Sequence, residues 1–282
     1  MSERSSEQHW VAERSHLLAL GYRMLGSWHD AEDVLQEVWI AWAAADRTPV
    51  RNPAAYLTTA MTRLSINRLR QRQRRQETYA GPWLPEPVAT ERLPEDSAVD
   101  RDSMSLATLH LLERLTPPER AAYVLRTGFA YSFKEIGLIL DRTEPTSRQL
   151  YHRARERMDA DARFQPDPAE HERLLIAVLA AARQGAVEDL ERVLHEDAVL
   201  WSDGGGKVAA AYKPILGSNR VARFMTGIFA KHPYATRIIQ VNGLPAVEFS
   251  VDGVRRIYAL RIVDGAVAEI LILANPDKLA YV

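Results

Sequence analysis

Four prolines within fourteen residues interrupt the chain after its first eighty residues, at positions 82, 85, 87 and 94. A stretch so rich in proline is extended and cannot be helical, because each proline lacks the backbone N–H that a helix needs. A second proline-rich break follows at Gln165-Pro-Asp-Pro168. We therefore predict four parts: residues 1–80, a linker at 81–104, residues 105–163 and residues 164–282.

The part before the linker ends in a basic helix. The range 51–76 contains seven arginines and no acidic residue. Leu57, Met61 and Leu64 form an apolar stripe that can dock the helix on a core. A solvated arginine face and a surface that binds a polyanion both explain such a run taken alone. Steps of four, three and four put four polar residues in one line on the helix: Arg63, Asn67, Arg70 and Arg74.

An earlier helix, after an amphipathic one at 9–26, carries acids instead of arginines. Asp30 followed by Asp33 is typical of a helix N-terminus, so we expect Asp30 to be the N-cap. An ordinary solvated face explains these acids as well as a binding face does. Beside an arginine-lined helix, however, they suggest one face for a protein partner and another for nucleic acid. The acidic face comprises Asp30, Asp33 and Glu37, flanked by Glu32 and Gln36.

Residues 105–163 have the pattern of a helix-turn-helix. Thr116-Pro-Pro-Glu119 and Ser132-Phe-Lys-Glu135 are capping boxes, and Thr143-Glu-Pro-Thr146 starts a third helix that runs to about Met158. Helix, three-residue turn and helix is the helix-turn-helix spacing. Arginine and glutamine can contact guanine and adenine edges in the major groove. The outward residues of the last helix are Thr146, Arg148, Gln149, His152 and Arg153.

The last third is expected to form an α+β cone. Helical patterns occur near 174–179, 187–194 and 221–230, and strand-like runs occupy 236–241, 247–251, 254–262 and 267–273. Asp252-Gly253 and Asp264-Gly265 separate such runs, which is a strong hairpin signal. Helices followed by a four-strand meander predict a curved sheet wrapped around helices, with a pocket at its open end. The fold class is thus multidomain, with two all-α helical domains followed by an α+β cone.

Composition excludes several classes of protein. The formal net charge is only −1, so a nucleic-acid partner would have to meet local basic clusters. The absence of cysteine excludes disulfides and thiolate metal sites and fits a reducing cytoplasm. The N-terminus lacks the apolar stretch of a signal peptide, and no run approaches the roughly 18 apolar residues of a membrane helix. We expect a cytoplasmic protein with no cofactor, no metal and no membrane partner.

Two long stretches resemble a known family. GYRMLGSWHDAEDVLQEVWIAWAAAD followed by NPAAYLTTAMTRLSINRLRQRQRR resembles the promoter-melting domain of bacterial sigma factors of the extracytoplasmic-function type. LTPPERAAYVLRTGFAYSFKEIGLILDRTEPTSRQLYHRARERM resembles their −35-recognition domain. The sequence departs from the family pattern at Asn67, where Asp is frequent, and at Asp141, where Gly is common.

The resemblance implies no catalytic residue and two partners, core RNA polymerase and promoter DNA. The clamp helices of the largest polymerase subunit would bind Asp30, Glu32, Asp33, Gln36 and Glu37. The −10 strand would lie along Asn52, Tyr56, Arg63, Asn67, Arg70 and Arg74. The helix of Thr146, Arg148, Gln149, His152 and Arg153 would recognise the −35 element.

The last third resembles the SnoaL-like branch of the nuclear-transport-factor-like fold, which includes polyketide cyclases and ketosteroid isomerases. Three short motifs, WLPEP, DGGGK and NPDKL, occur together in the sigma subgroup with a fused SnoaL-like domain. The resemblance implies that this domain adjusts sigma activity, and it leaves open a small-molecule ligand in the pocket. The expected interdomain residues are Trp83, Leu84, Pro85, Asp203, Gly204, Gly205, Gly206, Lys207, Asn275, Pro276, Asp277, Lys278 and Leu279.

Alternatives remain at this point. A DNA-binding module fused to an isomerase or cyclase would need an acid–base pair in the cone, and the candidates are His195, Asp197, Asp203 and Tyr258. An ordinary helix-turn-helix regulator would leave the acidic and arginine-rich helices unexplained. Trp83 and Leu84 could simply tether the linker or could be a docking motif, since an indole gains little unless it enters a pocket.

Overall fold

The computed structural model describes residues 3–45, 50–76, 79–93, 104–159, 168–231 and 235–282. These form two compact units. The first comprises Met1–Glu77, Leu93–Met104 and Leu111–Asp161, and the second comprises Thr78–Arg92, Ser105–His110 and Ala162–Val282. The helix-turn-helix therefore packs with the N-terminal helices, whereas the first part of the linker packs with the C-terminal residues.

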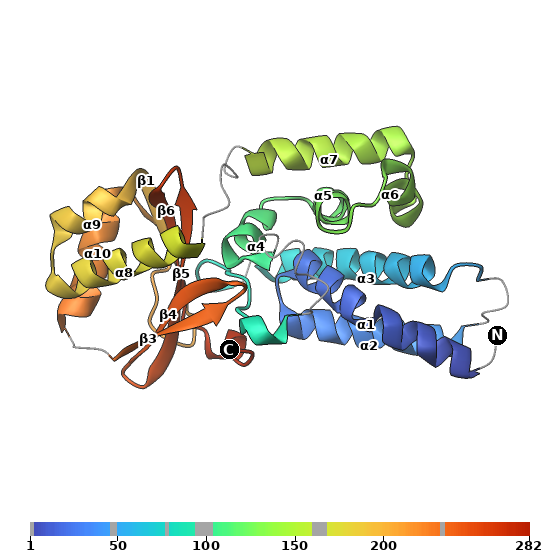
Figure 1. Cartoon of the computed structure of the whole chain (residues 1–282), viewed down its shortest axis with the longest axis horizontal. Helices are drawn as coiled ribbons and strands as arrows, with labels where there is room; N and C mark the ends of the chain where they lie inside the picture. The colour runs from blue at the N-terminus through green and yellow to red at the C-terminus, as the bar shows by residue number, and fades with distance from the viewer. Residues whose placement is uncertain (1–2, 46–49, 77–78, 94–103, 160–167, 232–234) are drawn as a thin grey trace. The chain divides into compact units, whose positions relative to one another are not determined.

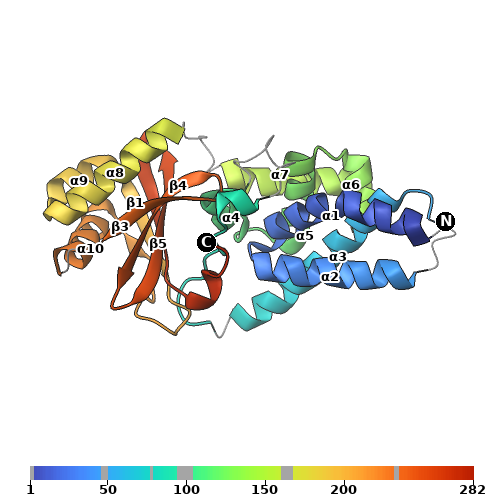
Figure 2. The same cartoon turned by 60° about the horizontal axis from the view of Figure 1, so that its bottom comes forward.

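Three long helices form the first half of the first unit: α1 (Glu3–Leu25), α2 (Trp28–Ala44) and α3 (Pro53–Gln76), which lie side by side in Figures 1 and 2. Ser27, not Asp30, is the N-cap of α2, because its hydroxyl accepts a hydrogen bond from the backbone N–H of Asp30 at 3.0 Å. The expected cap was wrong because Trp28 and His29 are already helical. Trp28 is buried and packs edge-on against Tyr22.

The second half of this unit contains α5 (Pro117–Phe129), α6 (Phe133–Leu140) and α7 (Glu144–Asp159). The boundary between the units falls inside α4 (Leu106–Leu112). Both predicted capping boxes are confirmed, since Glu119 and Glu135 each accept a hydrogen bond from the backbone N–H of their cap residue. The turn before α7 places Asp141 in the left-handed region with φ 56°. Gly137 permits this tight turn, because a Cβ there would lie 2.7 Å from the carbonyl oxygen of Arg142.

The C-terminal part of the second unit begins with α8 (Pro168–Gln184) and α9 (Val187–Val193), and α10 (Ser218–Lys231) follows later. Its sheet has the strand order β2-β1-β6-β5-β4-β3. The strands are β1 (Leu194–Asp203), β2 (Ile215–Leu216), β3 (Thr236–Val241), β4 (Leu244–Val251), β5 (Val254–Val263) and β6 (Ala266–Leu273).

The expected four-strand meander is present as β3 to β6, but it is only part of this sheet. The long strand β1 runs parallel to β6, with Leu200 opposite Ile270, and β2 pairs with its other edge. The turns at Asp252-Gly253 and Asp264-Gly265 have positive φ values at all four residues, as the hairpin signal predicts. Helices on a curved sheet confirm the predicted α+β cone.

Both faces of the sheet are buried, because successive side chains of a strand point to opposite sides. On one face α8 and α10 pack against the strands, with Leu174, Val221 and Leu260 in the core. On the other face Leu84 of the linker and Leu279 near the C-terminus pack in a second cluster. The linker is extended as predicted from Pro82 to Val88, and it then enters a short 3₁₀ turn (Thr90–Arg92).

None of the helices in the described residues is long and apolar enough to cross a membrane. The same residues contain no group of acidic or histidine side chains arranged to hold a metal ion.

Candidate functional site

The acidic face of α2 is paired with one arginine of α3. Arg68 lies with its guanidinium 3.2 Å from Asp30, 3.8 Å from Asp33 and 2.7 Å from Glu37. These acids are partly exposed, with Asp33 and Glu37 at 44% and 49% side-chain exposure. Exposed ion pairs of this kind contribute about 0–1 kcal/mol, so a partner can replace them at little cost. The neighbouring Glu32 is half-buried and Gln36 is exposed.

The predicted polar line on α3 is partly open to solvent. Asn67, Arg70 and Arg74 are exposed, and they form no side-chain hydrogen bond or ion pair with any residue that the structure describes. At the helix start, the Asn52 side chain accepts a hydrogen bond from the backbone N–H of Ala55 at 3.1 Å. Tyr56 is 38% exposed, and its ring centroid lies 5.5 Å from that of the buried Trp42.

Arg63, in the same line, is already engaged by the helix-turn-helix. Its Nε donates to the carbonyl oxygen of Ile139 at 2.9 Å, and its Nη2 donates to that of Leu138 at 3.5 Å. These are the free carbonyls at the C-terminal end of α6, which favour a cation. In this conformation the guanidinium of Arg63 holds two helical regions of the first unit together.

Further contacts join the same two helical regions. The hydroxyls of Thr58 on α3 and Tyr131, just after α5, lie 3.2 Å apart. The ring of Phe129 lies 4.7 Å from that of His16, with the guanidinium of Arg23 4.9 Å from its centroid. The helix-turn-helix is therefore packed against the arginine-rich helix bundle through polar and aromatic contacts.

A buried charge network lies between these regions. Glu113 accepts hydrogen bonds from Arg72 at 2.7 Å and from Arg120 at 2.8 Å. Arg72 also donates to the carbonyl oxygen of Leu25, and Arg120 donates to that of Arg23 at 3.2 and 3.3 Å. Burial alone would raise the pKa of Glu113, but the two guanidinium charges outweigh it and lower that pKa to about 2.

No sequence motif marks the residues of this network. One signal was available, because Arg72 continues the buried stripe of α3 that includes Met61, Ser65 and Leu69. An arginine in an apolar stripe must find a buried acid. Its partner, Glu113, lies in an irregular segment after α4 and has no periodic pattern that would single it out.

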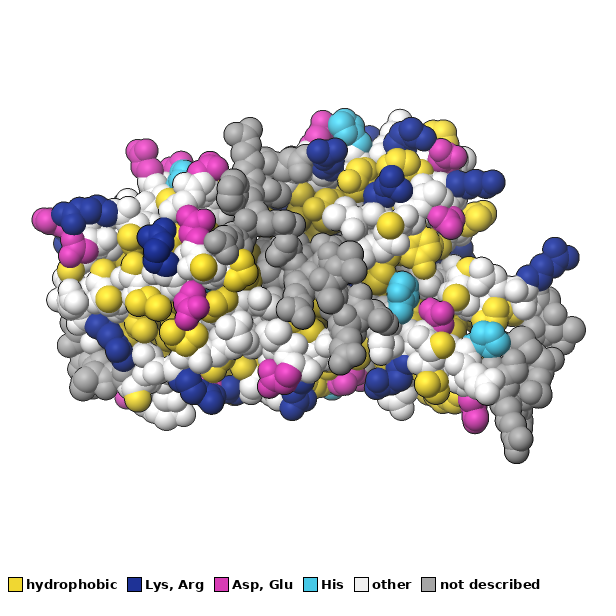
Figure 3. Space-filling view, viewed as in Figure 1, with side chains coloured by type: hydrophobic (Ala, Val, Ile, Leu, Met, Phe, Trp, Pro, Cys, Tyr) yellow, Lys and Arg dark blue, Asp and Glu magenta, His cyan; other side chains and the backbone are white. Residues whose placement is uncertain are grey.

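Four of the predicted recognition residues are exposed on α7, and Thr146 is half-buried. Of the residues that the helical pattern predicts to face inward, Ser147, Ala154 and Met158 are buried and Leu150 is half-buried. Arg148 pairs with Glu144 at 2.8 Å, and its guanidinium lies 5.1 Å from the ring centroid of Phe133. Several lysines and arginines lie over α6 and α7 in the space-filling view (Figure 3). Gln149 and Arg153 are exposed. The imidazole of His152 lies 3.5 Å from the carboxylate of Glu156. The hydroxyl of Thr146 lies 2.9 Å from that of Thr143.

The three short motifs converge on Asp203 in the second unit. Its carboxylate is fully buried and accepts hydrogen bonds from Lys278 Nζ at 2.6 Å and from the backbone N–H of Leu84 at 2.9 Å. Tyr79 donates to it at 2.6 Å, and the backbone N–H of Gly205 donates at 3.0 Å. One residue of each motif thus takes part in a single buried cluster, which we call the linker clamp: Tyr79, Leu84, Asp203 and Lys278.

Lys278 completes the linker clamp. Its ammonium donates to the carbonyl oxygen of Leu84 at 2.6 Å and lies 3.1 Å from the ring centroid of Trp83, a cation–π geometry. Burial, followed by the neighbouring Asp203 carboxylate, raises the pKa of Tyr79 well above its usual range, so the phenol stays a donor. Tyr79 belongs to none of the three motifs, and the sequence analysis missed it.

The remaining motif residues support the linker clamp. Asn275 caps the 3₁₀ turn Pro276–Lys278 and donates to Tyr79 at 3.0 Å. A Cβ at Gly205, where φ is +60°, would lie 2.3 Å from the Asn275 amide nitrogen, so only glycine fits there. Lys207 and Asp277 form an exposed pair at 2.5 Å. Of the others, Gly204, Pro85 and Leu279 are buried, Pro276 is exposed, and Gly206 has a φ of +70°.

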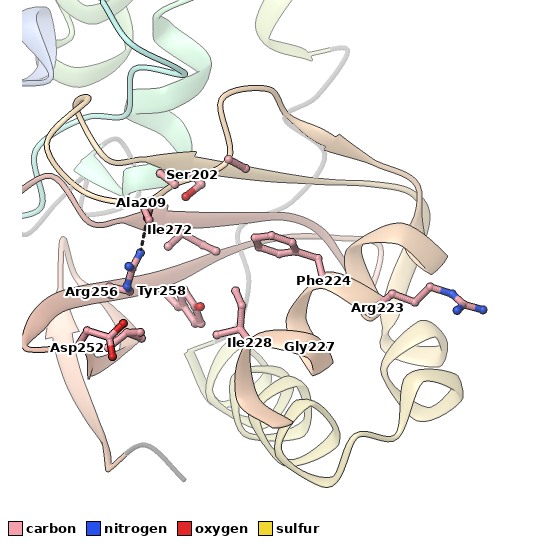
Figure 4. Close-up of a pocket in the computed structure, with 13 residues that line it drawn as sticks. Ser202, Ala209, Arg223, Phe224, Gly227, Ile228, Asp252, Arg256, Tyr258 and Ile272 are labelled. Carbon is pink, nitrogen blue, oxygen red and sulfur yellow. Dashed lines mark hydrogen bonds between the residues drawn. The ribbon is translucent and has the colours of Figure 1, made fainter. Parts of the chain in front are cut away.

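The cone contains a cavity of about 610 Å³ between the sheet and α10 (Figure 4). Of the four candidates for acid–base chemistry only Tyr258 lines it. Asp203 is engaged in the linker clamp, and His195 and Asp197 are exposed on β1. The described residues thus bring together no acid–base pair from that candidate set.

Comparisons with known proteins agree with the resemblance in both units. Residues 10–75 match the family model described as Sigma-70 region 2, and residues 105–158 match that of Sigma-70, region 4. SigI of Mycobacterium tuberculosis, described as a probable ECF RNA polymerase sigma factor, is 28% identical over 96% of this chain and 93% of its own. The ECF RNA polymerase sigma factor SigJ of the same organism is 36% identical over 95% of this chain and 91% of its own.

The crystal structure of SigJ superimposes on this structure with a TM-score of 0.76, at 35% identity and over 97% of each chain. Two helical sigma regions followed by a helix-and-sheet domain are therefore shared along almost the whole length. The chain belongs to the extracytoplasmic-function (ECF) sigma factors of RNA polymerase.

Proposed function

We propose that this sigma factor regulates itself: its C-terminal domain, through the linker clamp, sets how readily the two DNA-contacting helical regions separate. Sigma factors bind core RNA polymerase and promoter DNA, and they direct transcription initiation without performing bond chemistry of their own. The protein acts in the cytoplasm together with the polymerase. Its binding energy stabilises melted promoter DNA, while the polymerase catalyses synthesis.

The polymerase contact is assigned to the acidic face of α2, with Asp30, Glu32, Asp33, Gln36 and Glu37. Its support is the partial exposure of these residues and the pairing of Asp30, Asp33 and Glu37 with the cationic Arg68. A basic surface of the polymerase would replace Arg68 as counter-charge.

Promoter DNA is assigned to two faces. On α3, the exposed Asn67, Arg70 and Arg74 suit the phosphates and bases of an unpaired −10 strand, together with Asn52 and Tyr56. On α7, the outward residues suit the −35 major groove: Thr146, Arg148, Gln149, His152 and Arg153.

Arg63 carries the argument for a closed, inactive conformation of the helical regions. The edge of the Arg63 guanidinium formed by Nε and Nη2 donates to the carbonyls of Ile139 and Leu138, so this edge is not available for a bidentate contact with a phosphate of the −10 strand. A bidentate contact of the −10 strand with this edge therefore requires the carbonyl contacts to open. The two arrangements are alternatives between which a regulatory domain can shift the balance.

The linker clamp is the means by which the C-terminal domain controls that balance. Its buried Asp203–Lys278 pair holds Leu84, and so fixes the segment of linker that follows the −10 helix in the chain. A linker held at this point restricts the separation that the helical regions can reach. We also assign the cavity of the C-terminal domain to a small-molecule ligand that would modulate the clamp.

In vitro transcription with core polymerase tests this proposal. Lys278→Met removes one charge of a pair whose side chains are 3% and 0% exposed, so the linker should be released and transcript yield should change. Arg192→Met is the matched control, because its pair with Asp189 on α9 lies outside the three motifs, is 72% and 54% exposed, and its loss should leave yield close to wild type. Equal yields from both variants would argue against control through the clamp, while no transcript from the wild type would refute promoter-directed initiation itself.

A further inference from the structure

The cavity of the C-terminal domain has the walls of a small-molecule site. Its volume of about 610 Å³ falls within the usual range for drug-sized ligands. Phe224 and Ile228 of α10 face Tyr258 and Ile272 of the sheet across it (Figure 4). Most of this lining is apolar, so the occupant must have an apolar body.

Gly227 lines the cavity from α10 and is exposed. It lies within α10, where glycine weakens a helix relative to alanine. Apart from its own helix, no atom of the described residues lies within 4 Å of the position that a Cβ would take there, so packing does not require glycine.

One cationic group at the cavity has an unused donor. The guanidinium of Arg256 donates through Nη1 to the carbonyl oxygen of Ala209 at 3.1 Å, as the dashed line in Figure 4 marks. Its Nε is shielded from the cavity, whereas its Nη2 forms no hydrogen bond with the described part of the chain. The terminal N–H groups of a guanidinium suit the oxygens of a carboxylate.

The other charged residues at the cavity do not compete for this position. Arg223 points its guanidinium away from the cavity in Figure 4, and its Nε donates to Asn219 at 2.9 Å. Asp252 is exposed on the turn between β4 and β5, and within the described residues it makes no ion pair with Arg256. Solvent screens the charge of Asp252, whereas Arg256 is half-buried.

We infer that the cavity binds a small apolar carboxylic acid, with its carboxylate on Arg256 and its apolar body against Phe224, Ile228, Tyr258 and Ile272. The carboxylate supplies an acceptor for Arg256 Nη2, and it can also receive a second N–H of the same guanidinium. The apolar walls exclude water and strengthen this contact. An uncharged analogue of the same shape would leave the donor poorly satisfied and would bind more weakly.

Ligand binding in the cavity can affect the linker through one short segment of the chain. Ser202, a cavity residue, directly precedes Asp203 of the linker clamp, and Ala209–Ala211 close the cavity on that side. The same segment borders Ala80 and Gly81 of the linker, because a second, smaller hollow is lined by these residues together with Gly204 and Ala210. This regulatory consequence rests on the proposed function; the binding site itself does not.

Calorimetric titration of the full-length protein tests the site without polymerase. The probes are phenylbutyrate, octanoate and indoleacetate, each paired with its uncharged amide. We expect at least one acid to bind roughly tenfold or more tightly than its amide, a difference that Arg256→Gln should abolish and Arg256→Lys should partly retain. Arg223→Gln is the matched control and should bind like the wild type.

Three results would each show that the cavity is not a carboxylate site. They are absence of binding by all three acids, equal affinity of acid and amide, and unchanged affinity in Arg256→Gln. Transcription assays then separate the two levels. If a bound acid changes the transcript yield of the wild type but not of Arg256→Gln, the cavity is coupled to sigma activity. If the acid binds but the wild type directs no transcription at all, the proposed function is wrong and the binding site is unaffected.

Discussion

Replacing Glu113 with glutamine should destabilise the packing between the helix-turn-helix and the N-terminal helices. Glu113 is the carboxylate shared by Arg72 and Arg120, whose side chains are 9% and 2% exposed. Glutamine has nearly the same shape but no charge, so two buried guanidinium groups would lose their counter-ion. Removing one partner of a buried ion pair typically costs about 3–5 kcal/mol.

The lowered pKa of Glu113 indicates a loss of stability of similar size. Its fall from 4.5 to about 2 in the folded protein corresponds to about 3 kcal/mol at 1.36 kcal/mol per pH unit. Because the folded pKa is depressed, this stabilisation is fully present above pH 4.5 and is lost as the pH falls toward 2. The difference between wild type and Glu113→Gln should therefore shrink over that pH range.

Hydrogen exchange measured by mass spectrometry can locate this effect. A loss of about 3 kcal/mol should accelerate exchange of the protected amides in α3 and α5 on the order of 100-fold at neutral pH. Glu144→Gln is the matched control, because its pair with Arg148 is 46% and 64% exposed and should contribute less than about 0.5 kcal/mol. If Glu113→Gln accelerates exchange no more than this control, the network does not hold the helical regions together.

Three other substitutions test the assigned surfaces. Asp33→Arg should weaken binding to core polymerase about tenfold or more, because it places a positive charge in the acidic face that meets a basic surface of the polymerase. Asp189→Arg on α9 is the control and should not weaken binding. Equal affinities of the two variants in a pull-down titration would contradict the docking face. The double variant Arg148→Ala, Gln149→Ala should discriminate less between base pairs of the −35 element, by about 1–3 kcal/mol per lost base contact. Unchanged promoter preference in a transcription assay would mean that another face contacts the DNA bases. Arg63→Gln should speed exchange at the C-terminal amides of α6 and reduce permanganate reactivity of the −10 strand; an effect on neither would remove Arg63 from both roles.

Local features of this protein followed from its sequence alone. The capping boxes at Thr116 and Ser132 and the Asp-Gly hairpin turns depend on residues only a few positions apart, so they can be predicted from the sequence. Periodicity likewise placed Ser147, Ala154 and Met158 on the buried side of α7. The assignment of individual residues to polymerase or DNA stays a prediction, since it rests on the family resemblance.

Tertiary structure decided the features that need distant partners. Strand β1 could be paired with β6 only in three dimensions, because parallel neighbours are joined by a long connection. The Arg72–Glu113–Arg120 network and the linker clamp join residues that are far apart in the sequence, and no periodic pattern links them. The sequence contained the charges and motifs, but burial determined which arginines are structural and which remain available to a polyanion.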